Sequence, residues 1–265
     1  MLTDIHYHPF DLNGVYPEHE EERRKIGVIA AASACDTEEF NYNEKLSQDA
    51  EKAEAAPLLS CFGIHPQIFK IRNNISVNDN ELLETLCSLA SEKRIKAIGE
   101  CGFDLYNSAF KETEKQQDLT FASHLEIAIR YNLPIILHVR RAMFKIFELT
   151  NILKKCKVVV FHSWSGTYEE GLALLRRGVN SYFSFGNTIM LNHKQAMKCC
   201  ALFPAERLLT ETDAPYQPHR GESYSRWSDL PLIIEAAAAL RSEAGNKTSV
   251  IEMEKQVESN FKWIF

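Results

Sequence analysis

The sequence lacks several features that would place it in common protein classes. It has no excess of positive charge, because 36 Asp and Glu outnumber 30 Lys and Arg and give a formal net charge of −6. No apolar run approaches the ~18 residues needed to cross a bilayer, and the N-terminus MLTDIHYHPF has neither the basic nor the apolar region of a signal peptide. These absences argue against a charge-based nucleic-acid-binding module and against a membrane protein, and they predict a soluble chain.

Cysteine is present, but without the spacing of a disulfide framework. The seven cysteines are odd in number, no CxxC motif occurs, and Cys199 and Cys200 are adjacent, which is awkward geometry for a mutual bridge. We therefore expect reduced thiols and a cytoplasmic protein.

The chain also lacks a Gly/Ser linker, a low-complexity segment and a repeat of solenoid period. At 265 residues and 45% apolar content it can bury one large core or two small ones. Because nothing marks a boundary, we expect residues 1–265 to form a single domain. No protein partner is evident, so a monomer is the simplest expectation.

What the sequence does contain is an alternation of short apolar segments with longer stretches of helical periodicity. Eight apolar segments are predicted as strands: 2–6, 26–34, 58–64, 95–101, 134–139, 158–163, 181–186 and 207–212. Helices are predicted at 37–55, 80–93, 114–131, 141–155, 167–177 and 193–201, with two more after the last strand. Eight such repeats in about 250 residues favour an α/β fold, the (β/α)8 TIM barrel. An open doubly wound sheet is the alternative.

Chemically reactive side chains recur at the C-terminal ends of the predicted strands. In chain order they are His6, His8, His65, Glu100, His138, His162 and Asp213. In a parallel barrel these strand ends converge on one face, so residues far apart in the sequence would surround one pocket. The irregular loop at 216–227 follows the last strand, where barrel enzymes often carry a substrate loop.

His6 and His8 are two residues apart, which on a strand places both imidazoles on one face and lets them chelate one ion. Two surface histidines are an equal alternative for a bare HxH pattern. Asp4 precedes them in the same alternation, and we expect it to point inward and orient an imidazole.

Glu100 ends the apolar segment IKAIGE, where a carboxylate is costly unless a partner or a metal compensates for lost hydration. Its two oxygens could bridge two cations, which makes it the candidate bridging ligand. A helix cap or a surface ion pair is the alternative. Gly99 and Gly102 flank it and indicate a close approach of the backbone to a ligand.

His138 and His162 follow the two most apolar predicted strands, and their shared position favours coordination over a core role. Asp213 ends LLTETD and can ligate a metal, activate the nucleophilic water, or do both. Glu211 shares its inward face, either one layer deeper or as a support behind the ligands.

Four histidines and two carboxylates exceed one tetrahedral shell, so we expect two divalent ions ~3.5–4 Å apart that share Glu100. Nitrogen and oxygen ligands suit zinc, manganese or magnesium. Such a pair would generate hydroxide and neutralise charge that develops on a phosphate or carbonyl oxygen.

Short motifs spread over nearly the whole chain carry a family resemblance. They are DIHYH at 4–8, GIHP at 63–66, IGECGFD at 98–104, LPIILHVRRA at 133–142, FHSWSG at 161–166, SFG at 184–186, LLTETDAPY at 208–216 and ESNF at 258–261. In this order they resemble the TatD family of metal-dependent hydrolases, the TatD-type deoxyribonucleases.

The resemblance implies a two-metal barrel enzyme that hydrolyses DNA, commonly as a 3′-5′ exonuclease, with Asp213 and Glu100 as catalytic residues. One ion would be held by His6, His8, Glu100 and Asp213, and the other by Glu100, His138 and His162. By position, His65 and Arg140 are the implied phosphate contacts, and an arginine suits phosphate because its fork binds two oxygens.

Some positions depart from the family pattern. Val139 and Arg141 stand where Ser and Asp usually flank the arginine, Trp164 stands where Phe is common, and the loop RGESYSRWSDLP lacks the usual Asn-Glu-Pro-like segment. These changes touch substrate contacts and leave the ligands intact. Two alternatives therefore stay open: hydrolysis of a carboxyl ester, lactone or amide, and a non-catalytic binding protein that retains the barrel.

Overall fold

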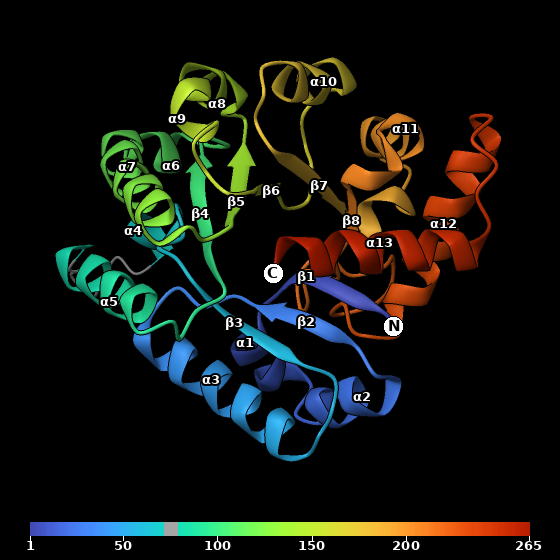
Figure 1. Cartoon of the computed structure of the whole chain (residues 1–265), viewed down its shortest axis with the longest axis horizontal. Helices are drawn as coiled ribbons and strands as arrows, with labels where there is room; N and C mark the ends of the chain where they lie inside the picture. The colour runs from blue at the N-terminus through green and yellow to red at the C-terminus, as the bar shows by residue number, and fades with distance from the viewer. Residues whose placement is uncertain (72–78) are drawn as a thin grey trace.

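The computed structural model describes residues 1–71 and 79–265, and within them eight parallel strands form one barrel surrounded by helices (Figure 1). The strands pair in chain order and are β1 Thr3–Tyr7, β2 Ile29–Ala32, β3 Leu58–Phe62, β4 Ala97–Asp104, β5 Ile135–Arg140, β6 Val159–Phe161, β7 Ser181–Phe185 and β8 Leu208–Thr210. The predicted (β/α)8 barrel is confirmed. The sequential strand order rules out the doubly wound alternative, in which the order reverses at a switch point.

The outer helices follow the strands along the chain. They are α1 Pro9–Val15, α2 His19–Ile26, α3 Thr37–Lys52, α4 Ile68–Ile71, α5 Asp79–Ser91, α6 Ser108–Lys111, α7 Glu114–Tyr131, α8 Met143–Glu148, α9 Thr150–Leu153, α10 Tyr168–Arg176, α11 Lys194–Leu202, α12 Asp229–Glu243 and α13 Val250–Ile264. Two short 3₁₀ helices, η1 Asn187–Ile189 and η2 Ala205–Arg207, lie before and after α11 in the connection from β7 to β8. Within the described part of the chain, no helix combines the length and apolarity of a membrane span.

Two apolar layers stabilise the barrel. Outward-facing strand residues such as Phe62 and Phe183 pack against helix residues such as Phe121, and the inward-facing Ile5 and Ile136 fill the barrel itself. Burial of such side chains contributes roughly 1.5–3 kcal/mol each, so the alternation of large apolar residues along the strands specifies which way each strand faces.

The strand β1 meets β8 through side chains and loop backbone. Thr210 Oγ1 donates to the Thr3 carbonyl at 2.9 Å, and the Asp213 N–H donates to the His6 carbonyl at 3.0 Å. These bonds fix the loop after β8 against the end of β1, which brings the first and last candidate ligands together.

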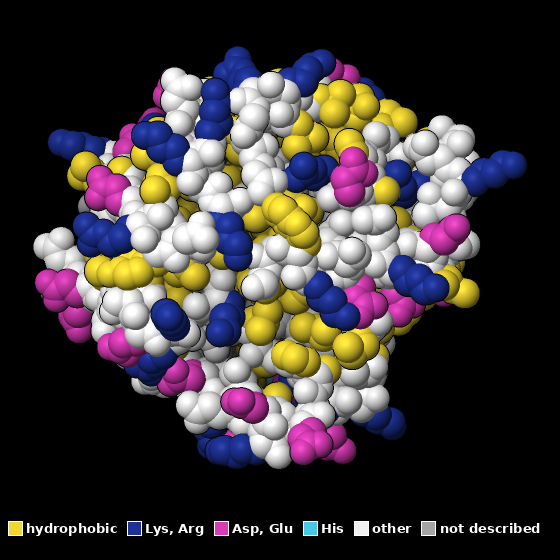
Figure 2. Space-filling view, viewed as in Figure 1, with side chains coloured by type: hydrophobic (Ala, Val, Ile, Leu, Met, Phe, Trp, Pro, Cys, Tyr) yellow, Lys and Arg dark blue, Asp and Glu magenta, His cyan; other side chains and the backbone are white. Residues whose placement is uncertain are grey.

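The helix α13 lies across the N-terminal end of the barrel. In Figure 1 this helix crosses in front of the strands, near the C-terminus. Phe261 and Ile264 pack into the inward-facing core, and Lys157 Nζ, just before β6, donates to the Ile264 carbonyl at 2.9 Å. Seen from the side that carries both termini in Figure 1, the surface in Figure 2 mixes acidic, basic and apolar side chains without a region of one sign. With this end covered, the opposite end, where the strands terminate, is the place for a site.

Several predicted bounds differ from the structure. The strand predicted at 95–101 runs from Ala97 to Asp104, so Glu100 lies within β4 and not at its end. The predicted strand 26–34 shortens to Ile29–Ala32 because its first residues finish the helix α2, which Gly27 ends with a φ of 80°. The predicted helix 141–155 starts only at Met143, since Arg141 has a φ of 55°, outside the helical region. It also divides at Leu149 into α8 and α9.

Candidate metal centre

The candidate ligands converge at the C-terminal end of the barrel, although the sequence separates the first from the last by about two hundred residues. His6 lies on β1 with His8 just beyond it, Glu100 lies on β4 and His138 on β5. His162 directly follows β6. Asp213 lies three residues beyond β8 and not on the strand, with a left-handed φ of 53°.

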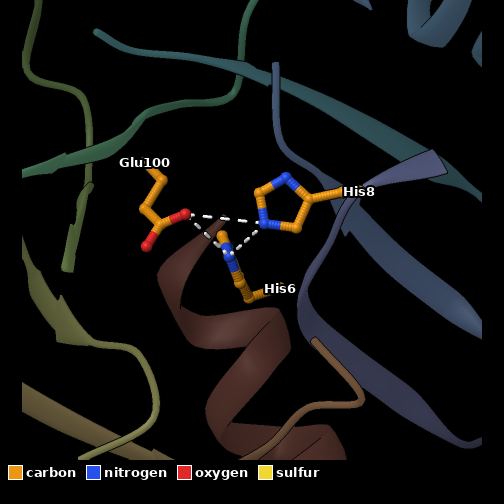
Figure 3. A group of neighbouring side chains, drawn as sticks. All are labelled: His6, His8 and Glu100. Atoms are coloured by element: carbon orange, nitrogen blue, oxygen red, sulfur yellow. Dashed lines mark hydrogen bonds and ion pairs between the residues drawn. The ribbon is translucent and has the colours of Figure 1, made fainter. Parts of the chain in front are cut away.

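The first donor set consists of His6, His8, Glu100 and Asp213. His6 Nε2 lies 3.1 Å from His8 Nε2 and 3.2 Å from Glu100 Oε2, and His8 Nε2 lies 3.5 Å from the same oxygen (Figure 3). Asp213 Oδ1 lies 3.6 Å from each imidazole nitrogen. Ligands ~2.0–2.2 Å from a tetrahedral ion are ~3.3–3.6 Å apart, so the distances from the two carboxylate oxygens to the imidazoles are close to those around one divalent cation, whereas the two imidazole nitrogens lie slightly closer together.

The second donor set surrounds the other oxygen of Glu100. His138 Nδ1 lies 2.7 Å, His162 Nε2 2.8 Å and His65 Nε2 3.4 Å from Glu100 Oε1. The two shortest distances are those of hydrogen bonds and fall below the edge of a coordination tetrahedron, so this set must open slightly to hold an ion. Each oxygen of Glu100 thus faces its own group of imidazoles, as a bridging carboxylate would.

The structure also groups the donors in ways that the sequence did not predict. Donor atoms of His6, His162 and Asp213 lie within 4.8 Å of one another, as do those of His65, Glu100 and His138. His65, expected to contact phosphate, therefore also stands among the possible ligands.

Three polar residues contact the far nitrogens of the imidazoles. Ser33 Oγ lies 2.9 Å from His6 Nδ1, and Asp104 Oδ2 lies 3.0 Å from His138 Nε2. Glu211 Oε1 lies behind the ligands, 3.5 Å from His162 Nδ1, but the two atoms form no hydrogen bond. Such partners fix the tautomer and ring orientation of a metal-binding histidine. Sequence reasoning missed Ser33 and Asp104, although Asp104 ends the IGECGFD stretch that carried the resemblance.

The role expected of Asp4 is wrong. Asp4 does not contact an imidazole; its carboxylate accepts the backbone N–H of His6 at 3.1 Å and the hydroxyl of Thr212 at 2.6 Å. Burial raises the pKa of Asp4 to about 8, against the lowering effect of these hydrogen bonds. Asp4 therefore ties β1 to the segment before Asp213 and acts on the backbone of the site.

The structure shows a packing reason for the flanking glycines. A Cβ on Gly102 would lie 2.3 Å from the carbonyl oxygen of His138, and one on Gly99 would lie 2.7 Å from Ile136. The glycines therefore permit a close approach between β4 and β5. It brings Glu100 and His138 within hydrogen-bonding distance.

The electrostatics of the centre depend on Glu100. Burial by itself raises the pKa of Glu100, but the surrounding histidines, His162, His65 and His6 foremost, outweigh it and hold this pKa well below its usual range. The carboxylate is therefore ionised at neutral pH, as a bridging ligand must be.

The imidazoles divide into two groups by the direction in which their pKa is shifted. Burial lowers the pKa of all of them and prevails at His6 and His65. At His8 the hydrogen bond with Asp213 and the charge of Glu100 outweigh burial and raise the pKa to about 8, and the pKa of His162 is raised well above its ordinary value, mainly by Glu100. Because ligation needs neutral imidazoles, a cation must compete with protons here.

Asp213 is held by a side chain that sequence reasoning missed. Gln217 Nε2 donates to Asp213 Oδ2 at 2.5 Å and to Ser163 Oγ at 2.9 Å. Ser163, Asp213 and Gln217 all have left-handed φ values, between 43° and 54°. Such backbone conformations concentrate at functional sites, where the surroundings hold them in place. Gln217 lies in the irregular loop predicted to contact substrate.

His124 on α7 is a histidine with a structural function near the centre. Its Nε2 accepts the backbone N–H of Ile64 at 2.9 Å, and its Nδ1 donates to the Thr120 carbonyl at 2.6 Å. It therefore fixes the segment that carries His65. The sequence offered no sign of this contact, because the residues lie sixty positions apart.

Arg140 lies at the exposed end of β5, with its guanidinium carbon 3.7 Å from the centroid of the Tyr106 ring. Arg140 lies two residues after His138 on β5. Because successive side chains of a strand point to opposite faces, the two side chains leave the same side of the strand. The arginine therefore stands beyond the donor cluster, toward solvent.

Comparison with known proteins agrees with this geometry. The family described as TatD related DNase matches residues 3–265. A Pantoea ananatis protein named 3′-5′ ssDNA/RNA exonuclease TatD is 32% identical over 233 residues, which cover 83% of each chain. An uncharacterized metal-dependent hydrolase of Mycoplasma pneumoniae is 35% identical over 174 residues, covering 60% of this chain and 66% of that one. The crystal structure of a TatD homologue from Escherichia coli superimposes with a TM-score of 0.78 at 24% identity and covers 100% of this chain and 97% of that one. The chain therefore belongs to the TatD family.

Proposed function

We propose that this protein is a divalent-metal-dependent hydrolase that cleaves phosphodiester bonds in DNA, as a 3′-5′ exonuclease. The observation that carries the proposal is the position of Glu100, whose two oxygens face two separate groups of imidazoles. Support for the substrate comes from relatives named ssDNA/RNA exonucleases. The whole chain, residues 1–265, would act as one catalytic domain.

In this proposal His6, His8, Glu100 and Asp213 would hold the first ion, and Glu100, His138 and His162 would hold the second. The nitrogen-rich donors favour zinc or manganese over magnesium. Bound divalent ions would lower the pKa of water and neutralise charge on the phosphate.

The chain's own residues then position the reactants. Asp213 Oδ1 faces the imidazoles of His6 and His8, and Gln217 fixes the other oxygen, so this carboxylate is placed to orient a water molecule or accept its proton. His65 and Arg140 would bind phosphate oxygens. Asp213 and Glu100 are the residues to which we assign catalysis.

The test compares substrates on the metal-loaded protein. Single-stranded DNA labelled at its 5′ end should shorten stepwise from its 3′ end in Mn²⁺, Zn²⁺ or Mg²⁺, and a blocked 3′ end should stop the reaction. Glu100→Gln keeps the shape of the side chain and removes its charge, so it should lower kcat by at least about 100-fold. A clear preference for a nitrophenyl carboxyl ester over nitrophenyl phosphodiester would contradict the proposal and favour the ester, lactone or amide alternative.

We also propose that the protein is a cytoplasmic monomer. None of the seven cysteines, all of which lie in the described residues, forms a disulfide bond, as expected where thiols stay reduced. Light scattering on the eluting protein should give the mass of one chain, 30.3 kDa, and twice that mass would contradict the monomer. Fractionation of the producing cells tests the compartment, which would be wrong if the protein appeared outside the cytoplasm.

A further inference from the structure

A cleft of about 440 Å³ opens beside the candidate metal centre, and we name it the Tyr106 cleft. It is lined by Tyr106 after β4, Arg140 at the end of β5, Arg141 just beyond it, Met143 and Phe144 on α8, the Ser165–Gly166 segment after β6, and one acidic residue, Glu170 on α10. Arg140 stands two residues beyond His138 on one strand, which is about 6.6 Å further from the barrel interior. The cleft therefore lies next to the second donor set.

The cleft and the donor cluster share one carboxylate. Asp104 Oδ2 contacts His138 Nε2 at 3.0 Å, and Asp104 Oδ1 accepts the backbone N–H of Tyr106 at 2.9 Å. The ring of Tyr106 is thus held in a fixed relation to the imidazole of His138. A ligand that spans both places would contact Tyr106 and the donor cluster at the same time.

The two arginines of the cleft are directed at an aromatic ring and not at an acid. Their guanidinium carbons lie 3.7 Å (Arg140) and 4.5 Å (Arg141) from the centroid of Tyr106, and Arg141 Nη1 donates to the Tyr106 carbonyl at 3.3 Å. Within residues 1–71 and 79–265, neither guanidinium forms an ion pair with a carboxylate. Arg141 has a left-handed φ of 55°, and this turn brings the neighbouring arginines to the same ring. Both retain donors for an anion, and a guanidinium fork suits phosphate.

The cleft also exposes aromatic surface. Tyr106 is 42% exposed and Phe144 is 53% exposed, although both line it. Exposed aromatic rings beside cationic side chains are the combination that binds unpaired nucleotides, because the rings stack on bases while the cations contact the backbone. A duplex hides the faces of its bases by stacking, so only a single strand can use both features.

We propose that the Tyr106 cleft binds one unpaired nucleotide of a single-stranded nucleic acid, next to the nucleotide whose phosphodiester lies at the donor cluster. Arg141, together with Arg140, binds its phosphate, and Tyr106 and Phe144 hold its base. The inference rests on the proposed function and extends it: the cleft selects single strands over duplexes and oligonucleotides over small phosphodiesters.

The first experiment measures binding without cleavage. A 5′-fluorescein-labelled ten-nucleotide deoxyadenosine strand is titrated with metal-free protein, and anisotropy gives Kd. Arg141→Ala and Phe144→Ala should each raise Kd about tenfold, since one phosphate contact or one stacked base is lost. Arg177→Ala is the matched control, because Arg177 also lies on an aromatic ring, 4.9 Å from the centroid of Phe147, but outside the cleft.

The second experiment identifies the base contact. Replacing the base next to the 3′ terminus by an abasic site should weaken binding of the unmodified protein about tenfold but weaken binding of Phe144→Ala much less, because both changes remove the same stacking contact. If the abasic site weakened binding of Phe144→Ala as much as binding of the unmodified protein, the two effects would be additive, and this would contradict a stacked base in the cleft.

These measurements separate the two proposals. Unchanged Kd in Arg141→Ala and Phe144→Ala overturns the cleft, even if the protein degrades DNA. If the protein hydrolyses a carboxyl ester and no DNA, the proposed nuclease fails, whereas a tenfold loss of strand binding in the variants still supports the cleft. Where DNA is cleaved, the ratio of kcat/KM for the strand to that for nitrophenyl phosphodiester should fall about tenfold in Arg141→Ala.

Discussion

Asp104 and Glu100 contact opposite nitrogens of the His138 ring: Asp104 Oδ2 lies 3.0 Å from Nε2 and Glu100 Oε1 lies 2.7 Å from Nδ1. With the far nitrogen held by a carboxylate, only Nδ1 is presented to the donor cluster. Burial raises the pKa of Asp104, but the hydrogen bonds with His138 and Gln67 outweigh it and lower this pKa to about 2. Asp104 therefore remains ionised and orients the ring.

Asp104→Asn should weaken divalent-metal binding about 10- to 100-fold, because the ring loses the charge that fixes its tautomer and orientation. Competition with a chromogenic chelator measures this affinity directly. The control is Asp118→Asn, which removes a carboxylate paired with Lys145 outside the site. Equal affinities of Asp104→Asn and the unmodified protein would show that His138 is not a ligand or needs no such support.

Gln217→Leu should lower kcat/KM about tenfold while leaving the thermal midpoint within about 2 °C, since Leu fills the space but cannot donate a hydrogen bond to Asp213. The loss of one hydrogen bond to a charged group at the reacting centre sets this magnitude. Gln195→Leu, which removes an amide bonded to Cys199 on α11, is the control. A fall in stability that matches the fall in rate would mean that Gln217 only supports the loop.

Divalent metal should stabilise the fold, because the donor cluster exists only in the folded chain. At a hundredfold excess over Kd the gain is about 2.7 kcal/mol, which corresponds to roughly 5–10 °C in Tm for a domain of this size. Calorimetry of chelator-treated protein with and without Mn²⁺ or Zn²⁺ measures it. Glu100→Gln should lose most of the shift, and an undiminished shift in this variant would place the ions elsewhere.

His124 should make stability depend on pH. Its Nε2 must be unprotonated to accept the Ile64 N–H, and burial, partly opposed by the bond to Thr120, lowers its pKa from 6.5 to about 4. Below pH 6.5 the unfolded chain takes up the proton first, so the free energy of unfolding falls as pH drops from 6.5 to 4. Over this pH range His124 lowers the free energy of unfolding by about 3 kcal/mol, and above pH 6.5 its stabilising contribution is fully present.

Urea unfolding of chelator-treated protein across this pH range tests the effect of His124. In His124→Gln the amide oxygen can still accept the Ile64 N–H but does not titrate, so its stability should fall less steeply with acid than that of the unmodified protein. His193→Gln, at an exposed position, should keep the original slope. Parallel curves for the unmodified protein and His124→Gln would refute the assignment.

Gly102→Ala should destabilise the protein by more than about 3 kcal/mol, because a Cβ there meets the His138 carbonyl at 2.3 Å and the φ of 130° is strained for any L side chain. Gly178→Ala is a matched control, since Gly178 also has a positive φ, 83°, but nothing lies within 4 Å of its Cβ. The control should lose only about 1 kcal/mol, the cost of the left-handed conformation. Equal losses of unfolding free energy in the two variants, measured by urea unfolding, would mean that β4 and β5 can move apart to accommodate a Cβ.

The sequence by itself determined the barrel and the positions of the main donors. Strand and helix periodicities are local, and a histidine or carboxylate stands out where it interrupts an apolar segment, as at His138 and Glu100, although both strands continue past these residues. Because parallel strands end on the same face, the convergence of these residues followed from the order of the elements alone.

Only the tertiary structure decided what holds the donors in place. Ser33 on His6, Asp104 on His138 and Gln217 on Asp213 are contacts between different strand ends, and their existence depends on the register of neighbouring strands and on loop backbone angles. The apolar alternation specifies which way each strand faces, but which side chains of neighbouring strands meet also depends on packing across the barrel and on the connecting loops. For the same reason Asp4 binds the backbone of His6 and not an imidazole, and Tyr106 meets two arginines that lie more than thirty residues away in the chain.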